Sequence, residues 1–286
     1  MESGYVLQIV LNGLFLSLTY AVMAVGLSLI FGVLRIINFA HGELLMIGAY
    51  LVWALVVGQN VPYPVAAICA FAFVACVGIA MERGLFRPTR ADPFRGFMLS
   101  VGVMYIAQVS ALIIFGTLNK SIPSVISGSV HLLGASLNID RLVLIPVNGA
   151  ILAAVWLFLE RSRYGRAIRA CIQDPEAAAL QGISRDRMSL LVMTIGAGIA
   201  GLAGAILFQT TSVTPFFGGN FVLKAFIVVI VGGMGSIGGT VIACFLFGFL
   251  DSSISTLLNP RITVVLDIVV LLFILRFRPR GFFGRE

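Results

Sequence analysis

The amino-acid sequence predicts an all-α, polytopic integral membrane protein with eight or nine transmembrane segments, one of them a broken or half helix. Hydrophobic residues make up 59% of the 286 positions, charged residues make up 11%, and the mean hydropathy is +1.07. Soluble domains contain roughly 45–50% apolar residues, and several stretches here exceed the roughly 18 apolar residues that indicate a membrane-spanning helix. Because the hydropathy is sustained, we expect residues 1–286 to form a single transmembrane domain.

Nine apolar blocks follow one another along the chain, and we expect each to form a helix. The block 222–231 is too short to span a bilayer alone. In order, the blocks are 5–33, 39–58, 65–81, 97–116, 142–159, 188–208, 222–231, 240–258 and 262–275.

Basic residues gather in three of the segments between or after these blocks. Four arginines lie in 82–96, six in 160–187 and four in 276–286, which is 14 of the 19 Lys and Arg. Cytoplasmic loops carry such an excess, so we expect the N-terminus outside and the C-terminus in the cytoplasm. The net charge of +7 then reflects membrane topology, and no nucleic-acid partner is expected.

This topology requires an odd number of crossings between the outer loop near 210–221 and the inner tail. The third crossing must be the run 222–231, extended by the glycine-rich segment 232–239. Ten helical residues rise only about 15 Å, half of a hydrocarbon core of roughly 30 Å. We therefore expect a broken helix whose glycine segment lies at membrane depth, buried in protein or lining a wet cavity.

A second interruption places polar residues between the first two apolar blocks, at 35–43. Interrupted hydrophobic segments in both halves of a chain are the best sequence indication of a transporter site. The candidates for the translocation pathway are therefore Asn12, Asn38, His41, Glu43, Gly232, Gly233, Gly235 and Ser236.

Some of these candidates also have a structural interpretation. Asn12 lies in the first apolar block, where polar groups often hydrogen-bond between helices. Glu43 is placed to pair with Arg35, and the glycines are suited to close helix packing.

Three charged residues occur in the last three blocks. Asp251 and Asp267 each need a partner if buried, and helix ends near Arg261 are expected to supply it. Lys224 is expected to extend to the outer surface, as long basic side chains do near helix ends.

The segment 160–187 contains a short predicted helix of its own. Asp174 is a favourable N-cap, Pro175 and Glu176 suit a first turn, the alanines favour helix, and Gly182 can end it. Two interpretations remain open: a docking helix for a cytoplasmic partner, which the spacing E-A-A-x-x-x-G favours, or an amphipathic helix on anionic headgroups.

The sequence lacks the G-x-x-x-x-G-K-[ST] loop of nucleotide-hydrolysing proteins. The four cysteines show no metal-ligand spacing. We therefore expect no catalytic residue, no metal and no cofactor bound by this chain, which is not an enzyme.

The motifs together resemble a known family, the permease subunits of ABC importers for branched-chain amino acids, of the LivH type. The resemblance covers essentially the whole chain and rests on 38–42 with 46–50, on the E-A-A-x-x-x-G segment and on 232–239. It implies that 1–286 is one transmembrane permease domain in the bacterial plasma (inner) membrane, and that 160–187 is its cytoplasmic coupling loop. The coupling helix would contain Asp174, Glu176, Ala177, Ala178 and Gly182.

The resemblance also implies the partners. These are a second permease subunit, homologous or identical, two P-loop ATPase subunits that use the ATP, a soluble solute-binding protein and the lipid membrane. The expected function is translocation of branched-chain or related amino acids, driven by the ATPases. The alternatives are a permease for urea or short amides, an ion-gradient-driven carrier that uses His41, Glu43, Asp251 or Asp267, and a scaffold without transport.

Overall fold

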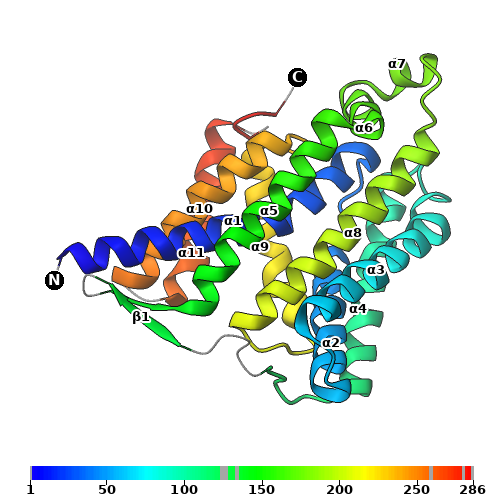
Figure 1. The fold of residues 1–286 in the computed structure, drawn as a ribbon. Helices are drawn as coiled ribbons and strands as arrows, with labels where there is room; N and C mark the ends of the chain where they lie inside the picture. The colour runs from blue at the N-terminus through cyan, green and yellow to red at the C-terminus, as the bar shows by residue number, and fades with distance from the viewer. Residues whose placement is uncertain (1, 123–127, 133–134, 258–259, 279–280, 285–286) are drawn as a thin grey trace. The chain divides into compact units, whose positions relative to one another are not determined.

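The computed structural model describes residues 2–122, 128–132, 135–257, 260–278 and 281–284. Within these residues the chain is predominantly helical (Figure 1). The elements are α1 (Glu2–Leu34), α2 (His41–Gln59), α3 (Tyr63–Met81), the π-helix η1 (Glu82–Phe86), α4 (Pro93–Phe115), β1 (Ser129–Leu132), β2 (Ala135–Asn138), α5 (Ile139–Arg161), α6 (Arg163–Gln173), α7 (Pro175–Leu180), α8 (Arg185–Thr210), α9 (Phe217–Gly232), α10 (Ile237–Leu257) and α11 (Pro260–Phe277).

Nine of the helices in the described residues, α1 to α5 and α8 to α11, correspond to the nine predicted apolar blocks. Seven helices in the described residues are long and apolar enough to cross a membrane, and α9 is a shorter apolar helix. The last block forms the 18-residue helix α11. The prediction of an all-α polytopic membrane protein is therefore confirmed.

The short segment differs in detail from its prediction. Helix α9 begins at Phe217 and has 16 residues, which correspond to a rise of about 24 Å. Gly233 and Gly235 have positive φ angles of 100° and 84°, which a right-handed helix does not contain. The glycine-rich segment is therefore a turn between α9 and α10, rather than an extension of α9.

The segment after α11 packs on this turn. The backbone N–H groups of Phe282 and Phe283 donate to the carbonyl oxygens of Val231 and Gly232, at 2.8 and 3.3 Å. A Cβ on Gly233 would lie 2.5 Å from the backbone nitrogen of Gly284. The tail thus supplies donors for carbonyls that the end of α9 leaves without helical partners.

The chain divides into two compact units. The first unit comprises 1–25, 123–152 and 224–286, and the second comprises 26–122 and 153–223. Helices α1, α5 and α9 each contribute residues to both units.

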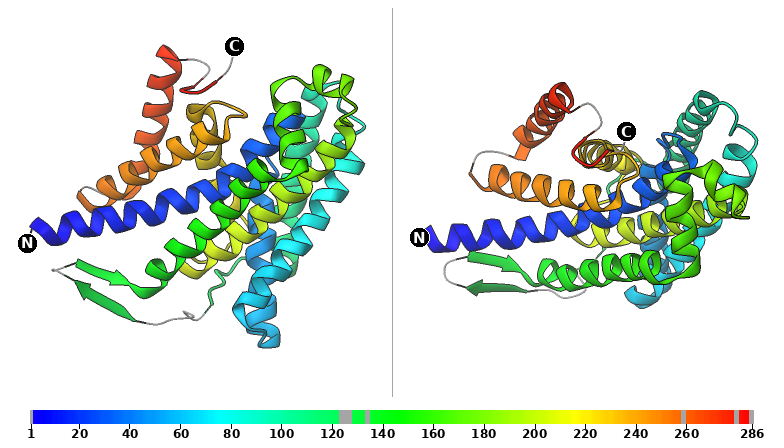
Figure 2. Two further views of the ribbon diagram at one scale, coloured as in Figure 1. Left: turned by 45° about the horizontal axis from the view of Figure 1, so that its top comes forward. Right: turned by 90° about the horizontal axis from the view of Figure 1, so that it is seen from above.

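The core of the second unit is the packing of α8 against α2 and α3, which lie beside it in Figure 2. Small residues make this packing close. A Cβ on Gly204 would collide with the Leu45 carbonyl, and one on Gly48 would collide with the backbone of Gly201. Tyr63, at the start of α3, donates to the carbonyl of Ala205 near the end of α8 at 2.7 Å. Gly78, near the end of α3, lies against Met193 in the first half of α8, so α3 and α8 run antiparallel.

In the first unit, α1 packs against α10 in the same manner. A Cβ on Gly248 would meet Ser17, and the Ser17 hydroxyl lies 3.4 Å from the Phe245 carbonyl oxygen. Nearer the N-terminus, Ser252 donates to the Ile9 carbonyl at 2.8 Å. These hydrogen bonds join two helices at polar side chains inside apolar runs, as expected in membranes.

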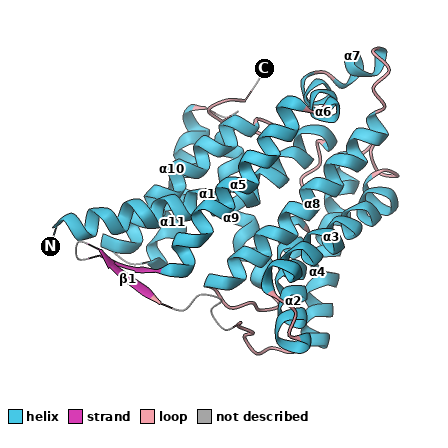
Figure 3. Cartoon of the chain, viewed as in Figure 1, coloured by secondary structure: helices cyan, strands magenta, loops and turns pink. Residues whose placement is uncertain are grey.

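The sequence predicts neither η1 nor the following two features. One is the antiparallel hairpin of β1 and β2, in which Ser129 faces Asn138 (Figure 3). The other is α6, which occupies the arginine-rich half of the segment 160–187.

We expect Gly204→Ala to destabilise the protein by about 1–3 kcal/mol, because the added methyl group would collide with backbone atoms rather than with a flexible side chain. The matched control is Gly102→Ala in α4, where an added Cβ would meet no described atom within 4 Å. Thermal unfolding in detergent compares the two variants. Equal melting temperatures would contradict the assigned packing of α8.

Candidate functional site

The segment between α5 and α8 is a projecting pair of helices, α6 and α7. Ser162 caps α6 by accepting from the Gly165 N–H at 2.8 Å. A Cβ on Gly165 would collide with the carbonyls of residues 158 and 159, so glycine permits the tight turn out of α5. Ile168 and Cys171 form the buried side of α6. Burial raises the pKa of the Cys171 thiol, which keeps this side chain neutral.

Helix α7 is short and capped at both ends. The Asp174 carboxylate accepts from the N–H groups of Glu176 and Ala177 at 2.9 and 3.0 Å. Gly182 follows the helix with φ +79°, the left-handed conformation that commonly ends helices. Both predicted caps are confirmed. Leu180 at the end of α7 is 88% exposed, so the helix presents an apolar side chain to its surroundings.

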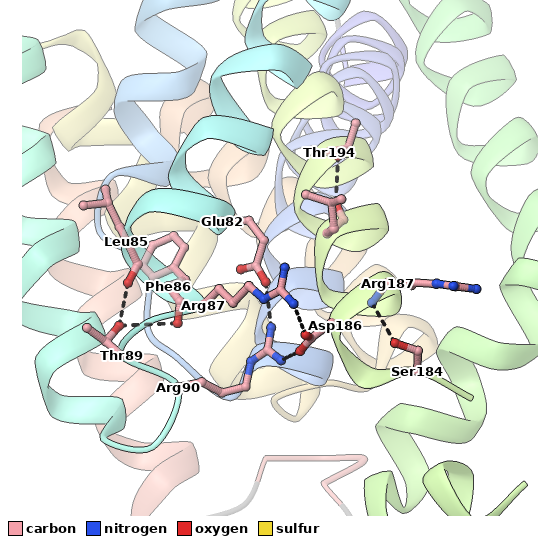
Figure 4. Close-up of polar contacts among 11 residues, drawn as sticks. Glu82, Leu85, Phe86, Arg87, Thr89, Arg90, Ser184, Asp186, Arg187 and Thr194 are labelled. Carbon is pink, nitrogen blue, oxygen red and sulfur yellow. Dashed lines mark hydrogen bonds and ion pairs between the residues drawn. The ribbon is translucent and has the colours of Figure 1, made fainter. Parts of the chain in front are cut away.

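The residues that follow α7 join an ion-pair network (Figure 4). Asp186, in the first turn of α8, accepts from both Arg87 and Arg90. Arg90 also donates to Glu82 of η1 at 2.7 Å. The network therefore connects the start of α8 with the end of α3 and the segment that precedes α4.

The two halves of this network differ in burial. The side chains of Arg87 and Asp186 are 54% and 42% exposed, whereas those of Arg90 and Glu82 are 16% and 1% exposed. An exposed ion pair contributes little to stability, but loss of one member of a buried pair leaves a charge without compensation. Arg90 is therefore the residue that compensates the buried charge of the Glu82 carboxylate.

A recess of about 270 Å³ lies beside these residues. It is lined by Glu82, Arg83, Arg87, Ser184, Asp186, Arg187 and Leu190. The recess thus shares its walls with the ion-pair network and with the capping residue of α8.

The interrupted segment between α1 and α2 contains two of the predicted pathway residues in buried positions. The Ser100 hydroxyl of α4 accepts from the Phe39 N–H at 3.1 Å and lies 3.3 Å from the Ile37 carbonyl oxygen. Asn38 is fully buried, and its side-chain amide has no partner among the described residues. His41 begins α2 and is also fully buried.

Glu43 lies one turn into α2 and is 1% exposed. Its partner is Gln108 of α4, whose amide donates to the Glu43 carboxylate at 2.8 Å. The expected pairing of Glu43 with Arg35 is therefore wrong. Arg35 has a positive φ of 57° and an exposed side chain, because it stands where α1 ends.

The other pathway candidates lie in the first unit. Asn12 of α1 accepts from Arg141 of α5 at 3.0 Å, which is the hydrogen bond between helices that its position favours. Gly232 ends α9, and a Cβ there would meet the backbone of Gly239 in α10. Gly233, Gly235 and Ser236 form the turn between these helices. The glycines thus permit close packing at this turn.

Lys224 does not extend to the outer surface, and this prediction is wrong. The side chain is 9% exposed and lies between Asp251 and Asp267, at 2.6 and 2.5 Å. The ammonium group satisfies two buried carboxylates at once, which favours burial over exposure. Lys224 is thus the partner of both aspartates, a role that was expected of helix ends near Arg261. The side chain of Arg261 lies outside the described residues.

Sequence reasoning missed two of these clusters. In the sequence the arginines near 83–95 indicate only membrane topology, and their pairing with Asp186 is not predicted. One lysine and two aspartates within the last three apolar blocks were a usable signal, because membrane-buried charges pair with one another.

The helices, the interrupted segment and the projecting α7 define a class, the polytopic permeases of membrane transport systems. The family model described as branched-chain amino acid transport system / permease component matches residues 9–275. This chain belongs to that family.

Relatives support the assignment. The high-affinity branched-chain amino acid transport system permease protein LivH of Salmonella typhimurium is 32% identical, over 98% of this chain and 96% of the relative. The corresponding protein BraD of Pseudomonas aeruginosa is 29% identical, over 99% and 97%. The solved structure of PsaBC from Streptococcus pneumoniae in complex with Fab has a similar fold, with TM-score 0.55 and 14% identity over 99% of this chain and 96% of that one.

We expect Arg90→Ala to destabilise the protein by about 3–5 kcal/mol, because Glu82 would remain buried without a partner. Arg87→Ala, which removes an exposed arginine from the same network, should cost less than about 1 kcal/mol. Adding Glu82→Gln to Arg90→Ala should restore most of the loss. Chemical denaturation in detergent measures all three, and equal effects of the two arginine substitutions would refute the assignment.

Proposed function

We propose that this chain is the membrane-spanning permease subunit of an ABC importer that translocates branched-chain or related amino acids. The observation that carries the proposal is α7, a capped helix with an exposed apolar end, held outside the predicted membrane spans. The high-affinity branched-chain amino acid transport systems named for its relatives support the substrate class.

The proposed complex contains two P-loop ATPase subunits, a second permease subunit and a soluble solute-binding protein. ATP is used by the ATPases, and this chain binds no cofactor. Asp174, Glu176, Ala177, Ala178 and Gly182 form the coupling helix within the cytoplasmic loop 160–187. The arginines that gather at this loop and at 82–96 support its cytoplasmic location, which puts the N-terminus outside and the C-terminus inside.

A displacement of α7 would be transmitted to the membrane helices through a series of hydrogen bonds and ion pairs. Ile183 donates to the Ala178 carbonyl at 3.1 Å, which ties the segment after Gly182 to α7. Ser184 then caps α8, and Asp186 connects α8 to η1 and α3 through Arg87 and Arg90. A partner that binds α7 and the adjacent recess would therefore displace α8 together with α3.

The proposed pathway in the second unit passes the interrupted segment. Asn38, His41 and Glu43 place polar groups in an otherwise apolar interior, and the free Asn38 amide can interact with a polar solute. Buried groups of this kind in membrane segments commonly mark solute pathways. Asn12, Gly232, Gly233, Gly235 and Ser236 remain the pathway candidates of the first unit.

We expect Glu176→Lys to reduce ATP-driven uptake at least tenfold while the permease still inserts and assembles. Glu176 is exposed in the first turn of α7, where a negative charge is favourable and a positive one is not. Uptake into proteoliposomes containing the full complex measures the effect. Gln173→Lys is the control, since it introduces the same lysine side chain just before the cap without removing a carboxylate from α7. Normal uptake by the Glu176 variant would exclude coupling through α7.

The proposed topology is tested by labelling with a membrane-impermeant thiol reagent, in a background without the four native cysteines. Ser212 is exposed after α8, and Leu180 is exposed at the end of α7. We expect Ser212→Cys to react in intact cells and Leu180→Cys to react only after the membrane is opened. The reverse pattern would invert the proposed topology.

A further inference from the structure

The Lys224 cluster is built from the middle of the last three helices. Lys224 belongs to α9, Asp251 to α10 and Asp267 to α11. The Lys224 Nζ atom lies 2.6 Å from Asp251 Oδ2 and 2.5 Å from Asp267 Oδ2. The two carboxylate oxygens therefore lie within 5.1 Å of each other, the sum of these two distances. All three side chains are more than nine-tenths buried.

The surroundings of the cluster supply few further donors. The Tyr20 hydroxyl of α1 donates to Asp251 Oδ2 at 2.8 Å. The Oδ1 atoms of Asp251 and Asp267 have no hydrogen-bond partner in the part of the chain that the structure describes. If both carboxyls were ionised, each would keep one charged oxygen without a donor.

The ammonium group itself is in a site suited to a positive charge. Lys224 Nζ lies 5.1 Å from the centre of the Tyr20 ring and 4.9 Å from that of Phe247, within the range of cation–π attraction. Among the described residues, the Cys244 thiol of α10 is a further titratable group beside the cluster and is fully buried. The described neighbours thus provide one cation for two carboxyls.

Charge balance follows from this count. With Lys224 charged and both aspartates ionised, the cluster has a net charge of −1 in a membrane interior, where an unbalanced charge is costly. Two carboxyls that share one buried site oppose each other's ionisation.

We propose that Lys224, Asp251 and Asp267 form a proton-binding site in the membrane interior, in which the two carboxyls share one retained proton and the cluster is neutral. The site pins α9, α10 and α11 to one another and to Tyr20 of α1. It is separate from the coupling helix, and its test does not depend on transport.

The proposal predicts a specific response to removal of either carboxyl. In Asp251→Asn, the remaining Asp267 faces Lys224 alone and ionises, and Asp267→Asn leaves Asp251 in the same state. Infrared spectroscopy of the full-length protein in detergent detects the carbonyl stretch of a protonated carboxyl. At neutral pH we expect one band to be present in the unsubstituted protein and lost in both variants, whereas a band from any other buried carboxyl, such as Glu43, is the same in all three proteins and cancels in the difference spectra.

The control is Glu160→Gln, which removes an exposed carboxylate paired with Arg169 and should leave the band unchanged. The proposal would be overturned if the difference spectrum between the unsubstituted protein and either variant contained no such band. A difference band that is lost in one single variant and persists in the other would also overturn it, because the surviving aspartate would then be protonated opposite Lys224.

Stability gives a second readout. Each single Asp→Asn variant keeps a balanced pair and should melt within a few degrees of the unsubstituted protein, whereas the double variant leaves Lys224 without a counter-charge and should melt of the order of 10 °C lower. Adding Lys224→Met to the double variant should recover most of this loss. Additive effects of the two aspartate substitutions would count against a shared proton.

Discussion

The close contact of α8 with α2 and α3 is the constraint on which the second unit depends. In a bilayer the apolar side chains of two helices gain little by meeting, so association depends on tight packing and on hydrogen bonds between helices. Glycines at positions 48, 201 and 204 allow backbone to approach backbone. The same helix α8 begins directly after α7, so the helix that is most firmly packed is also the one that leads to the projecting segment.

In this protein, hydrogen-bonding groups from distant segments reach backbone N–H and C=O groups that helix ends leave without a hydrogen-bond partner. The Ser100 hydroxyl accepts a hydrogen bond from the irregular segment between α1 and α2, and the tail after α11 donates hydrogen bonds to the carbonyls at the end of α9. Both arrangements follow from the rule that a membrane interior offers no water to unpaired backbone groups. The interruptions are therefore tolerated because distant segments supply the missing hydrogen bonds. Each interruption thus depends on the tertiary fold.

Sequence reasoning predicted the features that depend on neighbouring residues. The apolar blocks, the Asp174 cap and the Gly182 end of α7 are local, since each is determined by residues within a turn or two. The partners of Glu43 and Lys224 are not local: Gln108 is 65 positions from Glu43, and Asp267 is 43 positions from Lys224. A single sequence contains no direct information on such pairings. Helix α6 was missed because its arginines were attributed to topology alone.

The tail that completes the end of α9 has a consequence for biogenesis. Phe282 follows Val231 by 51 residues, so α9 leaves the ribosome well before the donors for its last carbonyls are synthesised. In the interval the turn at Gly233 lacks those donors, because the residues of α10 and α11 are synthesised before Phe282. The end of α9 can therefore reach its final hydrogen-bonded state only after residues 281–284 have been synthesised.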